Sequence, residues 1–343
     1  MVLRGRNPLK TIAKEGDPRD VTLTTVVYVP ELVGYWEESL ATLRLCLTSL
    51  VNNSGDDFDL MVFDNGSCDE VRRYLLDLHE QGAIQYLFLS ADNMGKAAAL
   101  NAMFGAAPGK YVAYTDSDVL FMPGWLDESI KAINTFERVG MVCGRPWRPL
   151  NDADNMLMEA NGDVAALMPR TSVERGDLIP AEYIEDHARS IDGVSPTLDV
   201  TGYDDMRLSR DGMSVFGFGS HFQYVTTKAV IREVGPLPVA ACGLDNQERV
   251  WDERVRELGY FRLALITPYV RHLGNTLEGE DVDALAQVAG TARQPTRVRQ
   301  LSPLSNWTRL FLLLMRVKLS RRLVVRLQRH MYEATRIWRR PDQ

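Results

Sequence analysis

Two carboxylates one residue apart, Asp116 and Asp118, are the side chains of this sequence best placed to do chemistry. They follow the apolar, β-prone run Tyr111–Tyr114. Residues i and i+2 of an extended chain lie on one side, and two acidic groups at the end of a buried strand are costly unless a cation sits there. The pair therefore predicts a divalent cation that also holds a phosphate. The alternative is a polar turn after an edge strand, because a D-x-D pair alone often occurs by chance.

Strands and helices alternate along the first part of the chain, and this alternation must position the carboxylates. β-branched or apolar runs predict strands, and apolar residues at helical spacing predict helices. The predicted strands are Val21–Val29, Phe58–Phe63, Ile84–Leu89 and Tyr111–Tyr114, and the predicted helices are Glu37–Val51, Asp69–Gln81 and Asn93–Ala107. This order predicts a parallel sheet covered by helices. Ligands of such sheets bind at the carboxyl ends of the strands.

Two further residues lie at ends of these elements. Asp64 closes the second strand, where it could accept an N–H of a nucleobase or, alternatively, form an Asx-turn or helix cap. Lys96 lies near the start of a helix, where the dipole disfavours a cation unless an anion is bound. A diphosphate would be such an anion, and a solvated surface lysine is the alternative.

Four motifs in this order resemble the nucleotide-sugar-binding half of a family 2 glycosyltransferase, the inverting type with a GT-A fold. They are Tyr28-Val29-Pro30, Val62-Phe63-Asp64-Asn65-Gly66-Ser67, Asn93-Met94-Gly95-Lys96 with Ala99-Leu100-Asn101, and Thr115-Asp116-Ser117-Asp118. The resemblance runs from about Val21 to Arg145 and resumes around Phe216 to Thr276. It implies a mostly parallel central sheet with helices on both faces, to which the chain adds a C-terminal helical extension.

The resemblance also implies roles for individual residues. Asp64 would contact the nucleobase, Asp116 the ribose and Asp118 a metal ion, Mn²⁺ or Mg²⁺. The residues expected to bind the donor are Tyr28, Pro30, Asp64, Asn93, Lys96, Asp116 and Ser117. The family often places a metal-binding histidine after the last strand, here predicted over Phe261–Val270, which makes His272 the expected second ligand and His221 its competitor.

Asp245 is the residue that the resemblance nominates as catalytic base. The family commonly has Glu-Asp at this position, but Leu244 replaces the glutamate here, so only Asp245 carries over. An Asp at a helix start is also a good N-cap, and capping does not exclude catalysis. Gln247–Trp251 is similar to the Gln-x-x-Arg-Trp box of processive synthases, but its arginine is one position off and the segment is too close to Asp245. We interpret it as coincidence.

The predicted function is metal-dependent, inverting transfer of a sugar from a nucleoside-diphosphate sugar to an acceptor hydroxyl, in polysaccharide, glycolipid or glycoprotein glycan assembly. One alternative is a non-catalytic nucleotide-sugar-binding scaffold or sensor, which would lack a base or a metal ligand. A second, a sugar-phosphate nucleotidyltransferase, is disfavoured because Pro30–Gly34 is not an arginine-containing, glycine-rich phosphate loop.

Charge is unevenly spread over the 343 residues, whose net charge is −7. Residues 303–343 carry ten Lys+Arg and two Asp+Glu, a net of +8, while residues 1–302 carry −15. We expect a GT-A catalytic domain over 1–302, with donor binding over about 21–145 and the acceptor side and base over about 146–276, followed by a basic amphipathic tail over 303–343. In the tail, Leu310, Val317, Val324, Met331 and Trp338 recur every seven residues. It could lie on an anionic membrane surface or pack on its own domain or a partner helix.

Composition bounds the remaining expectations. The acidic body makes nucleic acid an unexpected partner. Four scattered cysteines and a polar N-terminus without an apolar h-region predict a cytoplasmic protein, with the inner face of the cell membrane as the peripheral alternative. Residues 151–211 carry fourteen Asp+Glu and five Lys+Arg and show no strand–helix alternation beyond a helix over Ala181–Ile191. We expect this stretch on the acceptor side, with a solvated acidic decoration as the alternative.

Overall fold

The computed structural model describes residues 17–148, 168–191, 203–239, 247–277, 279 and 281. The chain divides into two units, Met1–Thr296 and Arg297–Gln343, and all described residues belong to the first. The predicted tail over 303–343 and the candidate base Asp245 lie outside the described residues. The proposed domain boundaries therefore stay predictions.

The first part of the chain alternates strand and helix as predicted. Its elements are β1 (Val21–Val27), α1 (Ser39–Asn52), β2 (Phe58–Asp64), α2 (Asp69–Glu80), β3 (Tyr86–Leu89), α3 (Lys96–Ala106) and β4 (Tyr111–Thr115). β1 pairs in parallel with both β2 and β4, and β2 pairs in parallel with β3. The carboxyl ends of these four strands therefore meet at one edge of the sheet, and this edge carries the predicted donor-binding residues.

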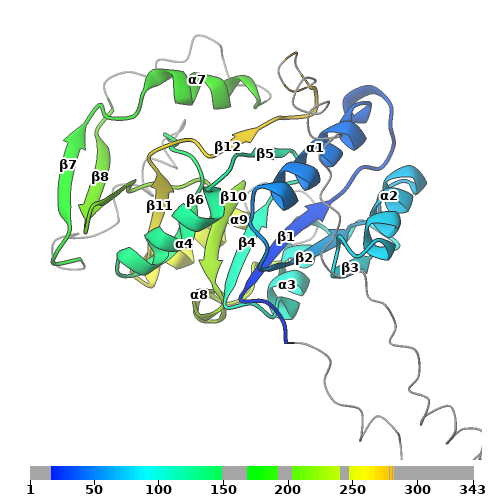
Figure 1. Ribbon diagram of the computed structural model, residues 1–343, viewed down its shortest axis with the longest axis horizontal. Coiled ribbons are helices and arrows are strands. Elements are labelled where there is room, and N and C mark those ends of the chain that lie inside the picture. Colours follow the sequence, from blue (N-terminus) through cyan, green and yellow to red (C-terminus); the bar gives the residue numbers. More distant parts are fainter. Residues whose placement is uncertain are drawn as a thin grey trace, which may run out of the picture. The chain divides into compact units, whose positions relative to one another are not determined.

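The central sheet has ten strands in the described part of the chain, in the order β3-β2-β1-β4-β10-β6-β11-β9-β8-β7 (Figure 1). The later strands are β6 (Val139–Cys143), β7 (Ser172–Gly176), β8 (Asp205–Arg210), β9 (Met213–Phe216), β10 (Gln223–Thr227) and β11 (Phe261–Leu265). β10 runs antiparallel to both β4 and β6, and β11 runs parallel to β6. Because β9 and β7 also reverse direction, seven of these ten strands point the same way.

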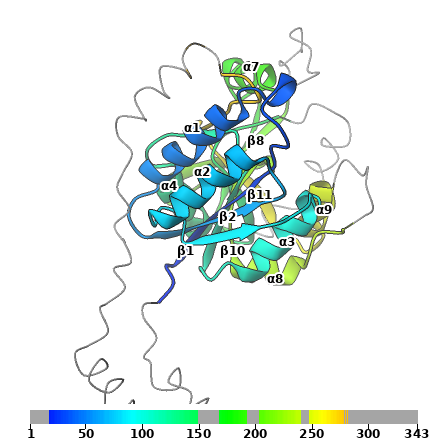
Figure 2. The same cartoon turned by 90° about the vertical axis from the view of Figure 1, so that its right-hand side faces the viewer.

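Helices cover both faces of the sheet (Figure 2). α1, α2 and α4 (Trp125–Thr135) lie on one side, and α3, α8 (Lys228–Val234) and α9 (Gln247–Glu257) lie on the other. Alternation along β2 supplies both cores, because Leu60 and Val62 belong to the cluster under α1 and α2. Met61 and Phe63 belong to the cluster under α3, α8 and α9. The predicted α/β fold, with a mostly parallel sheet and helices on both faces, is confirmed.

Two parts of the sheet differ from the sequence prediction. The acidic stretch contributes β7 and β8, which continue the sheet, beside the predicted helix, which is α7 (Ala181–Arg189). The predicted last strand, Phe261–Val270, divides into β11 and β12 (Val270–His272), because Pro268 has no backbone N–H to donate to a ladder. β12 instead pairs antiparallel with β5 (Val119–Phe121) in a separate two-stranded sheet.

Buried arginines hold the acidic stretch against the rest of the domain. Arg148 is 1% exposed and donates from Nε to Asp205 Oδ1 at 2.9 Å. Its guanidinium also pairs with Asp177, and Arg145 pairs with Asp186 of α7 at 3.1 Å. Several acidic side chains of this stretch thus serve as structural partners of buried cations.

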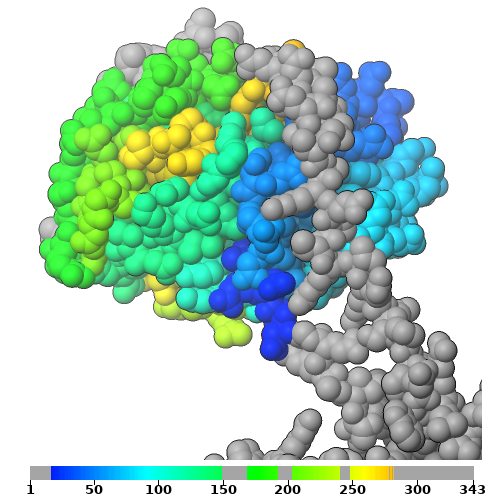
Figure 3. Space-filling view, viewed as in Figure 1, coloured from blue at the N-terminus to red at the C-terminus, as the bar shows by residue number. Residues whose placement is uncertain are grey.

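The segment that carries β11 and β12 is yellow on the surface in Figure 3 and lies among the green residues of the acidic stretch and the teal residues of the first half.

Within the described part, no helix is long and apolar enough to cross a membrane.

Candidate donor and metal site

The loop after β1 leads into the candidate site. Tyr28 is 39% exposed at the end of β1, and Pro30 is half-buried. The backbone N–H groups of Asn65 and Cys68 donate to the carbonyls of Val27 and Val29, each at 2.8 Å. These two bonds fix the end of β1 beside the end of β2, which brings Tyr28 and Pro30 to the edge where Asp64 lies.

Asp64 is fully buried, and both of its carboxylate oxygens have partners. Oδ1 accepts a hydrogen bond from the Ser67 backbone N–H at 2.9 Å, and Oδ2 pairs with Arg72 Nε at 3.1 Å. Arg72 also donates to the Ser90 carbonyl at 2.7 Å, which joins α2 to the end of β3. The turn-forming role that the sequence left open is thus present, and the contact with a nucleobase stays a prediction.

Asn93 joins the loop after β2 to the loop before α3. Its Oδ1 accepts from Asn65 Nδ2 and from the Gly95 N–H, both at 2.9 Å. Gly66 allows these two loops to lie this close together, because its φ is +86° and an added Cβ would lie 2.8 Å from the backbone carbon of Asp92. The two loops fix the start of α3 and with it the position of Lys96.

Lys96, the first residue of α3, lies between two carboxylates. Its Nζ is 2.7 Å from Asp116 Oδ1 and 2.8 Å from Glu248 Oε1. Burial alone would lower the pKa of the Lys96 ammonium, but the charges of Asp116 and Glu248 outweigh burial and raise the pKa. These carboxylates are the anions that stabilise a cation at this helix start. Contact between Lys96 and a diphosphate stays a prediction.

Asp116 and Ser117 follow β4 directly, and both are half-buried. The Asp116 carboxylate accepts a hydrogen bond from the Tyr114 hydroxyl in addition to its pair with Lys96. Burial would raise the pKa of Asp116, but Lys96 and Tyr114 outweigh this effect and lower the pKa. Lys96 and Tyr114 thus favour the ionised form of Asp116 at the edge of the sheet, in which both carboxylate oxygens can accept hydrogen bonds.

The structure brings His272 close to Asp118, and the role of the two residues as metal ligands stays a prediction. In the small sheet His272 is opposite Val119, and the Leu273 N–H donates to the Asp118 carbonyl at 2.7 Å. His272 Nε2 lies 3.4 Å from Asp118 Oδ2, while its Nδ1 lies 2.9 Å from the Ser190 hydroxyl. The competitor His221 lies instead beside Asp252, 3.1 Å from its Oδ2.

The side chains around Asp118 fit a divalent cation. Its Oδ1 is buried and has no hydrogen-bond partner among the described residues, and burial raises the pKa of the carboxyl. Beside it, Asp116 and Glu248 bring two further carboxylates against the ammonium of Lys96. A mixed carboxylate–imidazole pair suits Mn²⁺ or Mg²⁺. Within the described ranges no group of three or more His, Cys, Asp or Glu side chains is arranged to hold a metal. Asp118 and His272 alone would therefore supply only part of a coordination shell.

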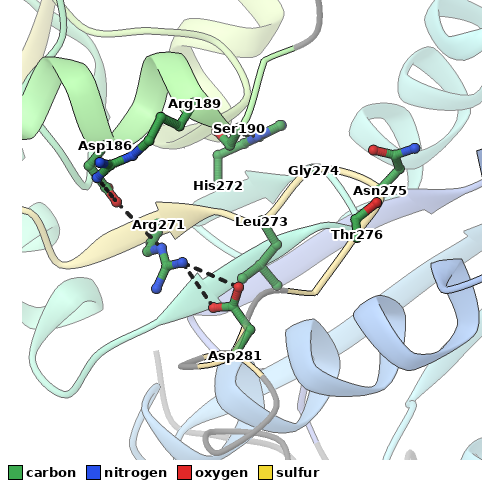
Figure 4. A pocket seen from close by; sticks show the side chains of 11 residues that line it. Asp186, Arg189, Ser190, Arg271, His272, Leu273, Gly274, Asn275, Thr276 and Asp281 are labelled. Carbon is green, nitrogen blue, oxygen red and sulfur yellow. Dashed lines mark hydrogen bonds and ion pairs between the residues drawn. The ribbon is translucent and has the colours of Figure 1, made fainter. Parts of the chain in front are cut away.

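A cavity of about 580 Å³ adjoins His272 on the side of α7 (Figure 4). The end of α7, β12 and the loop after β12 line it, and its side chains are polar apart from Leu273 and two glycines. Gly274 adopts a φ of +72° and packs against the Ser190 carbonyl, which an added Cβ would approach to 2.9 Å. Arg271 crosses the cavity wall between Asp186, at 3.6 Å, and Asp281, at 3.1 Å. Polar walls of this kind suit a hydroxylated ligand.

Glu248 is a site residue that the sequence reasoning missed. The pattern around it was interpreted as coincidence, and the available signal was a carboxylate in the first turn of a predicted helix. Its contact with Lys96 joins two remote segments, which no local pattern reveals. Arg72 and Ser190 were missed for the same reason, because each acts through a partner from another element.

Comparison with known proteins defines the class. Residues 34–188, a little under half of the chain, match the family Glycosyl transferase family 2. This stretch includes Asp64, Asn93, Lys96, Asp116 and Asp118. This segment is therefore similar to family 2 glycosyltransferases, the family that its motifs resemble.

Curated relatives match over short stretches. An uncharacterized glycosyltransferase of Nostoc sp. is 29% identical over 100 residues, which is 29% of this chain and 31% of that protein. An uncharacterized glycosyltransferase of Rickettsia bellii is 26% identical over 113 residues, 33% of this chain and 15% of that protein. This chain thus matches less than a third of the length of each relative.

Solved structures with similar folds include TarS of S. aureus, at 12% identity and a TM-score of 0.44, covering 79% of this chain and 64% of that one. Another is the mannosyltransferase PcManGT of Pyrobaculum calidifontis in complex with GDP-Man and Mn²⁺, at 18% identity and a TM-score of 0.41, covering 74% of this chain and 55% of that one.

Proposed function

We propose that this protein is a metal-dependent, inverting glycosyltransferase that moves a sugar from a nucleoside-diphosphate sugar to an acceptor hydroxyl, in the assembly of a polysaccharide, glycolipid or glycoprotein glycan. The observation that carries the proposal is the meeting of Asp118 and His272, from remote segments, beside Asp116 at the carboxyl edge of the sheet. The family 2 segment, which contains Asp116 and Asp118, supports glycosyl transfer.

The donor would bind along this edge. Asp64 and Asn93 would bind the nucleobase end, Asp116 would bind the ribose, and Lys96 would bind the diphosphate. Asp118 and His272 would hold Mn²⁺ or Mg²⁺, and such a cation neutralises charge that develops on a leaving diphosphate. The unpartnered Oδ1 of Asp118 supports this assignment, because a carboxylate oxygen without a hydrogen bond retains its lone pairs for a metal.

The acceptor would bind in the polar cavity beside His272. Its hydroxyl oxygen attacks the anomeric carbon from the face opposite the diphosphate, so the carbon–oxygen bond to phosphate breaks as the new glycosidic bond forms and the configuration inverts. The hydroxyl proton passes to a carboxylate near the head of α9, for which the sequence nominates Asp245. A general base of this kind contributes about 10²- to 10⁴-fold in rate.

A thermal-shift panel tests donor binding. UDP, GDP, UDP-glucose, UDP-N-acetylglucosamine and GDP-mannose are each added with Mn²⁺ or with EDTA. We expect at least one nucleotide to raise the unfolding midpoint in Mn²⁺, because a ligand of the native state stabilises by mass action. Asp118→Ala should fold normally and lose the metal-dependent part of this rise in the unfolding midpoint. A midpoint that responds to no nucleotide contradicts the proposal.

Turnover separates an enzyme from the alternative, a nucleotide-sugar-binding scaffold or sensor. An enzyme releases nucleoside diphosphate from the bound donor in Mn²⁺, with water or sugar as acceptor, and the release stops in EDTA. Binding without release in either condition favours the scaffold.

We also propose that the protein works from the cytoplasm at the inner face of the cell membrane. The net charge of +8 over residues 303–343 supports this placement, because each basic side chain near an anionic leaflet adds about 1 kcal/mol. The full chain should float with anionic vesicles and be released by salt. A chain ending at Ser302, and a full chain with Arg316, Lys318, Arg322, Arg326 and Arg329 changed to Gln, should not float. A full chain that ignores anionic lipid, or a truncated chain that aggregates, assigns the tail to the core instead.

A further inference from the structure

A second cluster of ionisable side chains lies on the α9 side of the candidate site. It consists of Glu248 and Asp252 of α9 and His221, which precedes β10, and we call it the α9 cluster. Glu248 lies in the first turn of α9, and its Oε1 is 2.8 Å from Lys96. Because Lys96 also pairs with Asp116, the cluster adjoins the residues proposed to bind the donor.

Asp252 is the fixed end of the cluster. It is 2% exposed, and Arg262, which is itself buried, lies 3.2 Å from its Oδ2. Arg262 also donates to the Gly219 carbonyl at 2.7 Å, which fixes the guanidinium in turn. Asp252 therefore presents a carboxylate in one orientation.

His221 is oriented by Asp252. Its Nδ1 lies 3.1 Å from Asp252 Oδ2, so in the neutral ring Nδ1 carries the proton that is donated to the carboxylate. The other nitrogen, Nε2, is then a bare acceptor and faces Glu248 Oε2 at 4.0 Å. A buried carboxylate that holds one histidine nitrogen and leaves the other to accept a proton is the arrangement used to move protons in many enzymes.

Glu248 is accessible as well as held. Its side chain is 22% exposed, and only one of its oxygens is committed to Lys96. The two atoms that face each other, Glu248 Oε2 and His221 Nε2, are both acceptors in this state. A proton on either atom would turn this pair of acceptors into a donor and an acceptor, and a closure of about 1 Å from the present 4.0 Å would bring them within hydrogen-bonding distance.

We propose that Glu248 takes the proton from the acceptor hydroxyl and that His221, positioned by Asp252, receives it from Glu248. In the first step the O–H bond of the acceptor breaks, its electron pair becomes the nucleophile, and Glu248 becomes a neutral carboxylic acid. In the second step that proton moves to Nε2 of His221, which becomes an imidazolium beside Asp252, and the Glu248 carboxylate is restored. The imidazolium loses the proton to water, since His221 is 41% exposed.

The charges that face His221 support its role as the second proton acceptor. Burial alone would lower the pKa of His221, and Lys96 acts in the same direction. The hydrogen bond and charge of Asp252, with the charge of Glu248, outweigh both and raise the pKa. The imidazolium is thereby stabilised, as it must be to receive a proton from a carboxylic acid.

This inference rests on the proposed glycosyl transfer and differs from it in one residue. The sequence nominates Asp245 as base, and Asp245 precedes Glu248 by three residues. Variants at the two positions separate the candidates. Glu248→Gln keeps an oxygen that can accept from Lys96 but cannot take a proton, and Asp245→Asn removes the other carboxylate.

The experiment measures nucleoside diphosphate release from UDP-glucose, UDP-N-acetylglucosamine and GDP-mannose in Mn²⁺, together with the donor-induced thermal shift. We expect Glu248→Gln to keep the thermal shift and lose at least about 100-fold in kcat, the lower end of a general-base contribution. Glu248→Asp should recover part of the rate, and Asp245→Asn should stay within about tenfold of wild type. Glu253→Gln, on the same helix and paired with Arg249, is the matched control and should leave kcat unchanged.

A pH profile tests the positioning role of Asp252. Because His221 must be neutral to receive the proton, kcat should rise with pH through the pKa of His221. Asp252→Asn removes the neighbouring charge, so the pH at which kcat rises should fall by about one unit or more. If Asp252 had only a structural role, the variant would lower kcat without shifting this pH.

Each remaining outcome is decisive. Normal turnover by Glu248→Gln, or loss of turnover confined to Asp245→Asn, overturns the relay and leaves the glycosyltransferase proposal standing. A wild-type protein that neither binds nor turns over any of the donors overturns both. If Glu248→Gln does not fold, Glu248→Asp and the pH profile of Asp252→Asn test the relay instead. An Asp252→Asn variant whose kcat rises at the same pH as in the wild type then refutes the relay.

Discussion

Replacing Asp118 by asparagine is expected to stabilise the metal-free protein and, in the same variant, to abolish stabilisation by a divalent metal. The Asp118 carboxyl is 31% exposed, and its buried Oδ1 has no hydrogen-bond partner among the described residues. Burial raises the pKa of the carboxyl and outweighs the charge of His272, which lowers it. Without a metal, the ionised carboxylate therefore costs more stability than an uncharged amide in its place.

The magnitude follows from the difference between an unsatisfied charge and an unsatisfied amide, because an asparagine oxygen would lack a partner as well. An unsatisfied neutral group costs about 1–3 kcal/mol and a charged one more, and the partial exposure of Asp118 keeps the gain small, about 1 kcal/mol. Mn²⁺ at a hundredfold excess over its Kd stabilises the wild type by about 2.7 kcal/mol. The order of stability should thus invert: the variant is above the wild type by about 1 kcal/mol in EDTA and below it by about 2 kcal/mol in Mn²⁺.

Urea unfolding in EDTA measures the stability difference without metal, and urea unfolding in Mn²⁺ with UDP or GDP measures the stabilisation by the metal. Asp77→Asn is the matched control, because Asp77 is exposed on α2 and should change stability by less than about 0.5 kcal/mol in either condition. A variant that is less stable than wild type in EDTA refutes the account of Asp118 as a strained carboxylate. A variant that Mn²⁺ stabilises as much as wild type refutes its role as a metal ligand.

Three further predictions concern the framework of the site. In urea titrations, Gly66→Ala should lower the free energy of unfolding by about 2 kcal/mol or more, because the new Cβ adds left-handed backbone strain and clashes with the loop at Asp92. Gly55 has a similar φ but open space around it, so Gly55→Ala should cost only about 1 kcal/mol. Arg148→Ala should lower the free energy of unfolding by about 3–5 kcal/mol, because it leaves Asp205 buried without its cation. Arg170→Ala, at an exposed ion pair, should lower it by less than about 1 kcal/mol, and equal effects of the two variants would contradict the role of the buried pair. The pKa of His221 is raised in the folded state, so its pair with Asp252 stabilises fully below the unfolded pKa of about 6.5 and is lost as pH rises through the folded pKa. The stability difference between wild type and His221→Asn should therefore shrink as pH rises above about 6.5, and a difference that grows would reverse the assigned sign.

Local sequence patterns were sufficient for the first half of the molecule. The β-branched run of β1, the leucine spacing of α1 and the turn residues after β2 each act over a few residues, so their periodicity predicts strand, helix and parallel order. Asp64, Lys96, Asp116 and Asp118 could be nominated for the same reason. Each lies at the end of such an element, and the ends of parallel strands meet at one edge of a sheet.

Interactions between remote segments decided the rest. The sequence predicted one strand over Phe261–Val270, but the chain divides at Pro268, and pairing of β12 with β5 sets His272 against Asp118. Glu248 reaches Lys96 only because α9 and α3 cover the same face of the sheet. The acidic stretch extends the sheet because Arg148 and Arg145 neutralise Asp205 and Asp186. Such contacts depend on which distant surfaces pack together, and the free energy of that packing is shared over many residues, so no short stretch of sequence records it.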